Sequence, residues 1–327
     1  MGDENKRIAG ACLGIALLFL SLSSARGSTI SGCTIINQSG AYELSQDIIN
    51  SSLGTCIEIK ASNVTLDCKG HLIDGIGKAN SRGIHSDGGK SNLTIKNCVI
   101  KEWERGIFLV ADVRDSLIIG NTIENCVYGI DLWNVYRSRI VSNWLVNNNY
   151  GILLTDLYGD TFYNNFLNNT YDNLKIAGTV YSNNWNTTKQ KGKRIYGVGI
   201  YMGGNFWAKP DGTGFSETCE DSDLDGICDS PFHLFTDNTD YLPLSLIAVK
   251  CGDGVCMKPY ETVATCFKDC GGIPYYLIST VSVLIIALAS ILLALKILKL
   301  KAPEDIIKIA VLIAIVYAVI GVAVSLL

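Results

Sequence analysis

The sequence predicts an all-β solenoid, a parallel β-helix with coils of about 22 residues. Three residue types recur with one shared period. Gly-Ile pairs begin at Gly83, Gly106, Gly129 and Gly151. An Asn ladder runs in phase with them through Asn97, Asn121, Asn143 and Asn165. An aliphatic ladder runs through Ile100, Ile123, Leu145 and Leu167. Three ladders with one period indicate one structural unit repeated along the chain.

Each repeat contains short β-prone runs, such as 93–96 and 117–119, broken by Gly and Asn. No stretch shows a helical stripe long enough to fill a repeat, which favours a β-helix over a helical or leucine-rich solenoid. The fifth position of the glycine ladder is occupied by Asn173. Asn is the residue that best replaces Gly where the backbone is left-handed, so we expect that conformation at these positions.

The composition places the chain in an oxidising compartment. It has 327 residues, a net charge of −4 and twelve cysteines, eleven of them outside an apolar leader. Such cysteine usage is typical of exported proteins. No basic face indicates nucleic-acid binding.

Residues 1–25 have the features of a secretory signal peptide. Lys6 and Arg7 precede an apolar run over 8–22, and small residues follow it. An uncleaved anchor is the alternative, although the run is short for a membrane span. After the leader, we expect an N-terminal cap over 28–66, because an open solenoid end would expose core and strand edges. The β-helix itself is expected over 63–245.

The end of the chain predicts a membrane anchor. Residues 250–271 form a cysteine-rich module, and two apolar segments at 273–295 and 306–327 are each long enough to span a bilayer. Lysines lie between them, and the positive-inside rule makes that loop cytoplasmic. The sequence therefore predicts a plasma-membrane protein whose β-helix faces the cell exterior.

The cysteines predict a disulfide framework. We expect bridges between Cys33 and Cys56 in the cap, between Cys68 and Cys98 on successive coils, and between Cys219 and Cys228 around an acidic loop. The last four cysteines are expected to pair among themselves in a connectivity left open, with a zinc site as the alternative: Cys251, Cys256, Cys266 and Cys270. Cys126 is then left as a free thiol.

Two stretches resemble a known family. The runs Asn63-Val-Thr-Leu-Asp-Cys and Leu93-Thr-Ile-Lys-Asn-Cys, followed by the Gly-Ile coils, resemble right-handed parallel β-helix surface proteins. The segment from Gly204-Asn-Phe-Trp to Asp240-Tyr-Leu-Pro-Leu is similar to the C-terminal end of the NosD-like β-helix family. The resemblance implies a right-handed β-helix of the carbohydrate-binding or sugar-hydrolase type. Its namesake is linked to copper delivery, but the three His and three Met of this chain show no clustered pattern.

The acidic loop over 219–229 is the sharpest chemical motif. Three aspartates alternate before Gly226, as in the first half of a calcium loop, although no Glu follows at the twelfth position. We expect structural Ca²⁺ bound by this set, with an acidic solvated turn as the alternative: Asp221, Asp223, Asp225, Ile227 and Asp229.

No catalytic pair is evident in the sequence. Arg82, Arg105 and His85 are expected in solvated coil turns. The sequence shows no pair of carboxyl residues that would indicate a glycosidase. Aromatic side chains in coil turns and flanks suit stacking on sugars, with packing between coils as the alternative: Trp103, Trp133, Tyr128, Tyr136, Tyr150 and Tyr158.

Together these features predict a membrane-anchored, non-catalytic cell-surface protein that binds surface glycans or scaffolds the envelope. A polysaccharide lyase, hydrolase or epimerase is one alternative, and a purely structural envelope stalk is the other.

Overall fold

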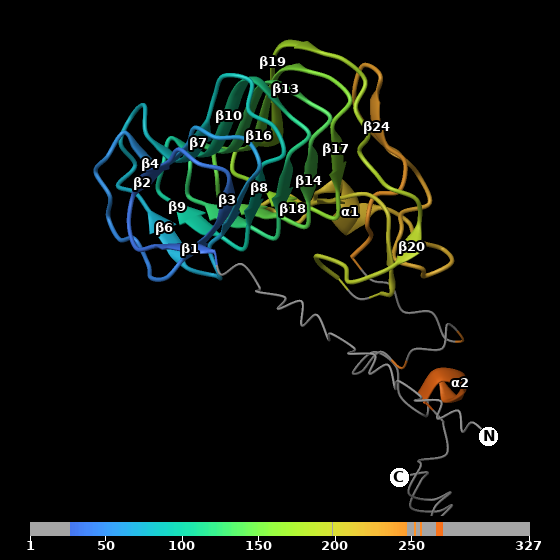
Figure 1. Cartoon of the computed structure of the whole chain (residues 1–327). Helices are drawn as coiled ribbons and strands as arrows, with labels where there is room; N and C mark the ends of the chain where they lie inside the picture. Colours follow the sequence, from blue (N-terminus) through green and yellow to red (C-terminus); the bar gives the residue numbers. More distant parts are fainter. Residues whose placement is uncertain (1–26, 198, 247–251, 253–255, 257–265, 271–327) are drawn as a thin grey trace, which may run out of the picture.

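A computed structural model describes residues 27–197, 199–246, 252, 256 and 266–270. Its main body is an all-β solenoid of three parallel sheets that share one core (Figure 1). The chain passes through sheet A, then sheet C, then sheet B in each complete coil. The predicted parallel β-helix is confirmed, and its right-handed sense stays a prediction.

The sheets take one strand from each successive coil. Sheet A contains β1 (Ser28–Ile30), β3 (Gly40–Leu44), β5 (Val64–Asp67), β8 (Thr94–Lys96), β11 (Leu117–Ile119), β14 (Arg139–Val141) and β17 (Thr161–Tyr163). Sheet B contains β2 (Thr34–Ile36), β4 (Thr55–Ile59), β7 (Arg82–Ser86), β10 (Arg105–Arg114), β13 (Tyr128–Tyr136), β16 (Tyr150–Leu157) and β19 (Asp172–Val180). Sheet C contains β6 (Leu72–Asp74), β9 (Val99–Lys101), β12 (Thr122–Glu124), β15 (Trp144–Val146), β18 (Phe166–Asn168) and β22 (Phe206–Trp207).

The remaining elements lie beyond the last complete coil. They are β20 (Gln190–Lys191) paired with β21 (Tyr201–Met202), β23 (Phe232–Phe235) paired with β24 (Asn238–Asp240), and the short helices α1 (Phe215–Thr218) and α2 (Phe267–Cys270). Both of these strand pairs are antiparallel, in contrast to the solenoid.

Like side chains stack from coil to coil because neighbouring strands are in register. Ile107 pairs with Ile130, which pairs with Ile152, and all three are buried. Ile100, Ile123 and Leu145 form an equivalent buried column in sheet C. Each coil buries its apolar side chains against the next, so the period seen in the sequence is the period of the core.

The glycine ladder exists because coils approach closely, and the expected left-handed backbone is wrong there. Gly83, Gly106, Gly129 and Gly151 do not have positive φ angles, and neither does Asn173. A Cβ atom at Gly106 or Gly129 would lie 2.6 or 2.7 Å from the carbonyl oxygen of the next ladder glycine. A side chain at these positions would therefore collide with the backbone of the following coil.

An internal amide ladder links the coils at the corner between sheets A and C. Asn121 Nδ2 donates to Asn143 Oδ1 at 3.0 Å, and Asn143 repeats this bond to Asn165 at 3.0 Å. Asn165 continues it to Asn205 at 2.9 Å. All four side chains are buried, so each amide is satisfied inside the protein rather than by water.

Asn97 is not part of this ladder, which corrects the sequence-based assignment. The backbone N–H of Cys98 donates to Asn121 Oδ1 at 3.0 Å, so Cys98 occupies the ladder position. Asn97 instead has a left-handed backbone and donates to Asp67 Oδ1. The first coils carry a disulfide at the place where later coils carry an amide.

Four disulfides join described cysteines, and three of them match the predicted pairs. Cys33–Cys56, Cys68–Cys98 and Cys219–Cys228 have Cα separations of 4.4, 4.7 and 5.7 Å. The first two bridge neighbouring coils, where strand spacing suits a disulfide. In the cysteine-rich module, Cys256 pairs with Cys270 and Cys266 is also disulfide-bonded, while Cys251 lies outside the described residues.

Cys126 is a free thiol, as predicted, and it is buried. Burial raises the pKa of this thiol to about 12. A second amide ladder that the sequence reasoning missed begins there, because Cys126 N donates to Asn148 Oδ1 and Asn148 Nδ2 donates to Asn169 Oδ1. Cys126 is therefore a core residue and not a reactive one.

The described residues contain no helix long and apolar enough to cross a membrane. The predicted signal peptide over 1–25 and the predicted spans over 273–295 and 306–327 all lie outside the described residues.

Candidate functional site

The outer face of sheet B is the broadest regular surface of the solenoid. Strands β10, β13, β16 and β19 have 8 to 10 residues, whereas the sheet C strands have only two or three. Register places the outward side chains of this face in columns. One column is Arg82, Arg105, Tyr128, Tyr150 and Asp172; a second is His85, Phe108, Asp131, Leu153 and Lys175. We call these two columns the sheet B face.

Two arginines meet on one aromatic ring at the N-terminal part of the sheet B face. The guanidinium carbons of Arg82 and Arg105 lie 5.3 and 5.1 Å from the ring centroid of Phe108. The ring of His85 stacks on Phe108 from the preceding strand, at 5.1 Å. Burial lowers the pKa of His85, so its imidazole is neutral at pH 7. The ring of Phe108 therefore holds both cations in place.

Arg105 also holds two carboxylates. Its Nε donates to Asp131 Oδ2 at 2.7 Å, and its Nη1 donates to Glu104 Oε1. Asp131 is only 3% exposed. Burial raises the pKa of Asp131 against the opposing effect of Arg105. Sequence reasoning missed this pair, because Glu104 and Asp131 are far apart in sequence and meet only through coil stacking.

The C-terminal part of the sheet B face is aromatic. The rings of Tyr128 and Tyr150 stack at 5.7 Å, and Tyr171 packs against Tyr150. Lys175 Nζ lies 4.4 Å from the ring centroid of Tyr150 and donates to the Tyr128 hydroxyl at 3.2 Å. Trp133, at the edge of this surface, is 49% exposed.

These positions revise the expectations for individual residues. Arg82 and Arg105 begin strands of sheet B, so the expected solvated turns are wrong for them. Trp103 is 1% exposed and donates from Nε1 to the Ile73 carbonyl, so it belongs to the core. Trp133 and Tyr158 are exposed, as predicted. The 22-residue period alone does not show which residues form the outward columns; the strand pairing is needed as well.

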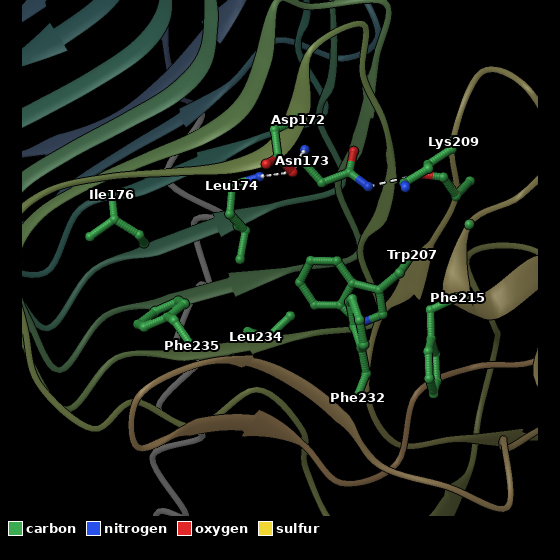
Figure 2. Close-up of a pocket in the computed structure, with 12 residues that line it drawn as sticks. Asp172, Asn173, Leu174, Ile176, Trp207, Lys209, Phe215, Phe232, Leu234 and Phe235 are labelled. Atoms are coloured by element: carbon green, nitrogen blue, oxygen red, sulfur yellow. Dashed lines mark hydrogen bonds between the residues drawn. The ribbon is translucent and has the colours of Figure 1, made fainter.

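A cavity of about 250 Å³ adjoins the end of the sheet B face (Figure 2). Leu174 and Ile176 of β19 line one side of it, and Trp207 and Phe235 line the other. Asp172, the last residue of the first outward column, also lines the cavity. In the part of the chain that the structure describes, no strand pairs with the outer edge of β19.

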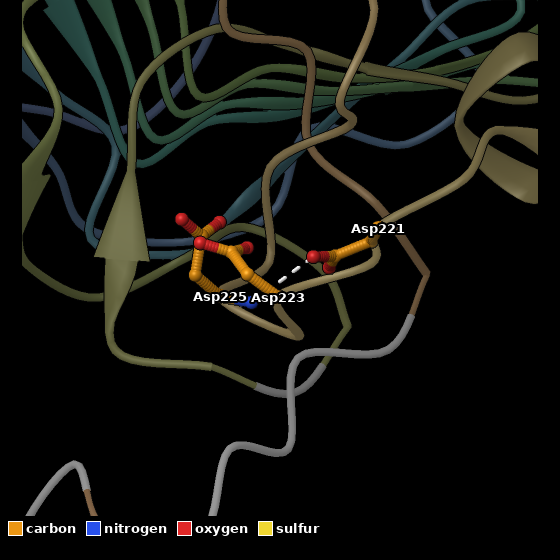
Figure 3. Close-up of side chains that lie close together, drawn as sticks. All are labelled: Asp221, Asp223 and Asp225. Carbon is orange, nitrogen blue, oxygen red and sulfur yellow. Dashed lines mark hydrogen bonds between the residues drawn. The ribbon is translucent and has the colours of Figure 1, made fainter.

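The acidic loop brings three of its predicted ligands together (Figure 3). Carboxylate oxygens of Asp221, Asp223 and Asp225 lie within 4.8 Å of one another. Asp221 also accepts bonds from the backbone N–H groups of Asp225 and Gly226, which folds the loop around its carboxylate. Three hard oxygen donors at this separation suit Ca²⁺.

The other members of the predicted calcium set have different contacts. Asp229 Oδ2 accepts bonds from the backbone and hydroxyl of Ser222, which lowers the pKa of Asp229. Ile227 donates its N–H to Asp225 Oδ1. The ammonium of Lys189 pairs with Asp225 Oδ2, so a protein cation already balances part of the loop charge.

The fold and these surfaces define a disulfide-bonded parallel β-helix in which one sheet face carries aromatic and charged side chains. The chain belongs to the NosD family: the family model described as "Periplasmic copper-binding protein (NosD)" matches residues 15–212, which is more than half of the chain. No curated protein matches the sequence.

One solved structure that resembles the chain is that of the Dettilon tailspike protein (gp208). It shares 15% sequence identity and a TM-score of 0.36, over 47% of this chain. The match spans only 37% of the tailspike chain.

The described residues do not offer the ligands that copper prefers. His71 Nδ1 lies 2.9 Å from Asp47, His85 contacts the Phe108 carbonyl, and His233 contacts Thr239. Among the described residues, the group able to hold a metal consists of Asp221, Asp223 and Asp225. Carboxylates alone suit a hard cation rather than copper, which favours imidazole and sulfur donors.

Proposed function

We propose that the chain is a cell-surface β-helix protein that binds a glycan on the sheet B face, without catalysis. The observation that carries the proposal is the pair of outward columns, which together place cations, aromatic rings and carboxylates along the solenoid axis. Sugar rings pack on aromatic faces, and their hydroxyls bond to charged groups beside them.

The repeat of the face suits a polymer better than a small ligand. The stacked rings of Tyr128 and Tyr150 lie on successive coils, with their centroids 5.7 Å apart. A chain of sugars lying along the solenoid axis would meet a similar surface at each step. The cavity beside Asp172 lies at the end of this path and would receive one terminal group.

A glycan array probed with the full-length chain tests the proposal. The Tyr150→Ala variant should bind its best glycan about tenfold more weakly, a loss at the lower end of the roughly 1–3 kcal/mol that nucleic-acid bases gain by stacking on an aromatic side chain. Tyr241→Ala is the matched control, because Tyr241 is 66% exposed and lies outside the sheet B face. Equal losses for both variants, or no glycan bound by the wild type, would contradict the proposal.

An enzymatic function has one specific observation in its favour. Asp131 and Glu104 share the guanidinium of Arg105, and burial raises the pKa of Asp131, as for a general acid. Glycoside hydrolysis requires such a carboxyl pair at a defined separation. Release of reducing or unsaturated sugar ends from any glycan bound on the array, abolished by Asp131→Asn, would favour this alternative.

Membrane anchoring and calcium complete the proposal. The segments 273–295 and 306–327 would hold the solenoid at the plasma membrane, with the module over 250–271 as a spacer. Calcium at Asp221, Asp223 and Asp225 would fix the C-terminal end of the solenoid. Surface glycans or envelope components are the partners that this arrangement implies.

A further inference from the structure

Arg82 forms no ion pair of its own among the described residues, although the charge of Asp131 acts on it. Its Nε is buried and has no hydrogen-bond partner, and the guanidinium makes no ion pair with any described residue. Leaving a buried donor unpaired destabilises the folded protein. Such an unpaired donor in a folded protein needs an explanation, of which a bound water or ion is one.

The neighbouring arginine shows what a satisfied guanidinium looks like on the same surface. Arg105, one strand further along the same column, bonds to both Asp131 and Glu104. Both guanidinium groups lie over Phe108, so they share one environment and differ in their partners. Arg82 therefore lacks a bonded carboxylate of the kind that Arg105 has.

The nearby acidic groups are engaged elsewhere. Glu58 lies beside His85 in the register and pairs with Lys60 at 3.3 Å. Asp87 lies 3.7 Å from His85 Nε2. Thr55, which pairs with Arg82 in the register, carries no charge. No described carboxylate can therefore neutralise Arg82 without giving up another contact.

We propose that Arg82 binds the carboxylate of an acidic sugar, so that the glycan on the sheet B face is a uronic-acid polysaccharide. The inference rests on the proposed glycan-binding function and adds the chemical class of the ligand. A planar guanidinium matches a carboxylate in two parallel bonds, which gives direction as well as charge. Phe108 beneath Arg82 fixes the position of the guanidinium, and Tyr128 lies further along the same face.

The test compares acidic glycans with their neutral counterparts on the full-length chain. Oligomers containing galacturonate, mannuronate or glucuronate are each measured beside the carboxyl-reduced form, with a sulfated neutral oligosaccharide as a further probe. We expect at least one uronate to bind about tenfold or more tightly than its reduced form, as for a charge-assisted bond, and to weaken as salt increases.

Variants assign the preference to Arg82. Arg82→Gln should lower the affinity for the uronate to that of the reduced form, so that the preference for the acidic glycan is lost. Arg82→Lys should keep part of the preference, because it retains the charge. Arg139→Gln is the matched control, since Arg139 is exposed on sheet A. Thermal unfolding of each variant shows whether it is folded.

Each outcome decides the matter. Equal binding of acidic and reduced glycans by the wild type would overturn the inference and leave the glycan-binding function standing. A preference for the sulfated probe over every uronate, or a preference unaffected by Arg82→Gln, would also overturn it. Failure to bind any glycan, acidic or neutral, would overturn the proposed function together with the inference.

Discussion

Asp160 is a buried side chain that destabilises the folded protein when it is ionised. It is fully buried in a third ladder, at the corner between sheets B and A, where Ser116, Ser138 and Asn183 also lie. Ser138 N donates to Asp160 Oδ1 at 2.7 Å, but Asp160 Oδ2 has no partner. Burial raises the pKa of Asp160 to about 8.

The ladder shows what the missing bond is. Ser116, Ser138 and Asn183 each donate from the side chain to the carbonyl two residues before them. An ionised Asp160 cannot donate, whereas a protonated carboxyl or an Asn at this position can. The carboxylate therefore lacks a bond that its neighbours all make, and this cost is removed by protonation.

Asp160→Asn should stabilise the protein at high pH. The pKa is raised on folding, so wild-type stability falls as pH rises from about 4 to about 8 and is constant beyond that window. The variant should lack this contribution to the slope and exceed the wild type by several kcal/mol at pH 9, with little difference at pH 4.

Denaturant unfolding of both proteins at several pH values measures this difference. Asp240, whose pKa burial also raises, contributes equally to both proteins and cancels. Asp237→Asn, an exposed carboxyl near the same ladder, should show no such pH-dependent gain. A variant that is less stable than the wild type at pH 9 would refute the explanation.

At the scale of single elements, the starts of strands β7, β10, β13 and β16 depend on glycine. A Cβ at Gly129 would lie 2.7 Å from the Gly151 carbonyl oxygen and 3.1 Å from Asn148 Nδ2. Both atoms belong to the next coil or to its ladder, so neither can move without disturbing the register.

Gly129→Ala should therefore destabilise the solenoid by about 1–3 kcal/mol, as overpacking does in other cores. Gly54→Ala is the control, because a Cβ there meets nothing within 4 Å and the φ angle is not positive. Thermal or denaturant unfolding distinguishes them. Equal stability of the two variants would show that the coils can separate at little cost.

At the scale of the whole molecule, the solenoid transmits stability only between neighbouring coils. Its C-terminal end is closed by Asp240, which is fully buried and accepts bonds from Asn205 N at 2.8 Å and Trp207 Nε1 at 2.9 Å. The acidic loop lies in the same closing segment, since Ile227 bridges to Leu244. Calcium there would act on this end alone.

The double variant Asp223→Ala, Asp225→Ala should lose a calcium-dependent rise in unfolding temperature. A ligand at 100 times its dissociation constant stabilises by about 2.7 kcal/mol, which is several degrees for a protein of this size. Glu220→Ala, an exposed acidic neighbour outside the cluster, should keep the rise. A wild type that is indifferent to both calcium and chelator would leave the loop as an ordinary acidic turn paired with Lys189.

The sequence by itself determined the coils, because stacking in register makes every core position recur at the coil length. The Gly-Ile and Ile/Leu ladders followed directly, and so did the pairs Cys33–Cys56 and Cys68–Cys98 on neighbouring coils. Asn97 was misplaced because it lies 24 residues before Asn121, whereas the true ladder position, Cys98, lies 23 residues before it and is not an Asn.

Only the tertiary structure decided what lies on the surface. Whether Arg82 points to solvent or to Phe108, and whether Asp131 meets Glu104, depends on which face of a strand each coil turns outward and which strand lies beside it. Trp103 was misjudged for the same reason. Periodicity identifies residues that share a column, but contacts across columns depend on the register and the orientation of three sheets together.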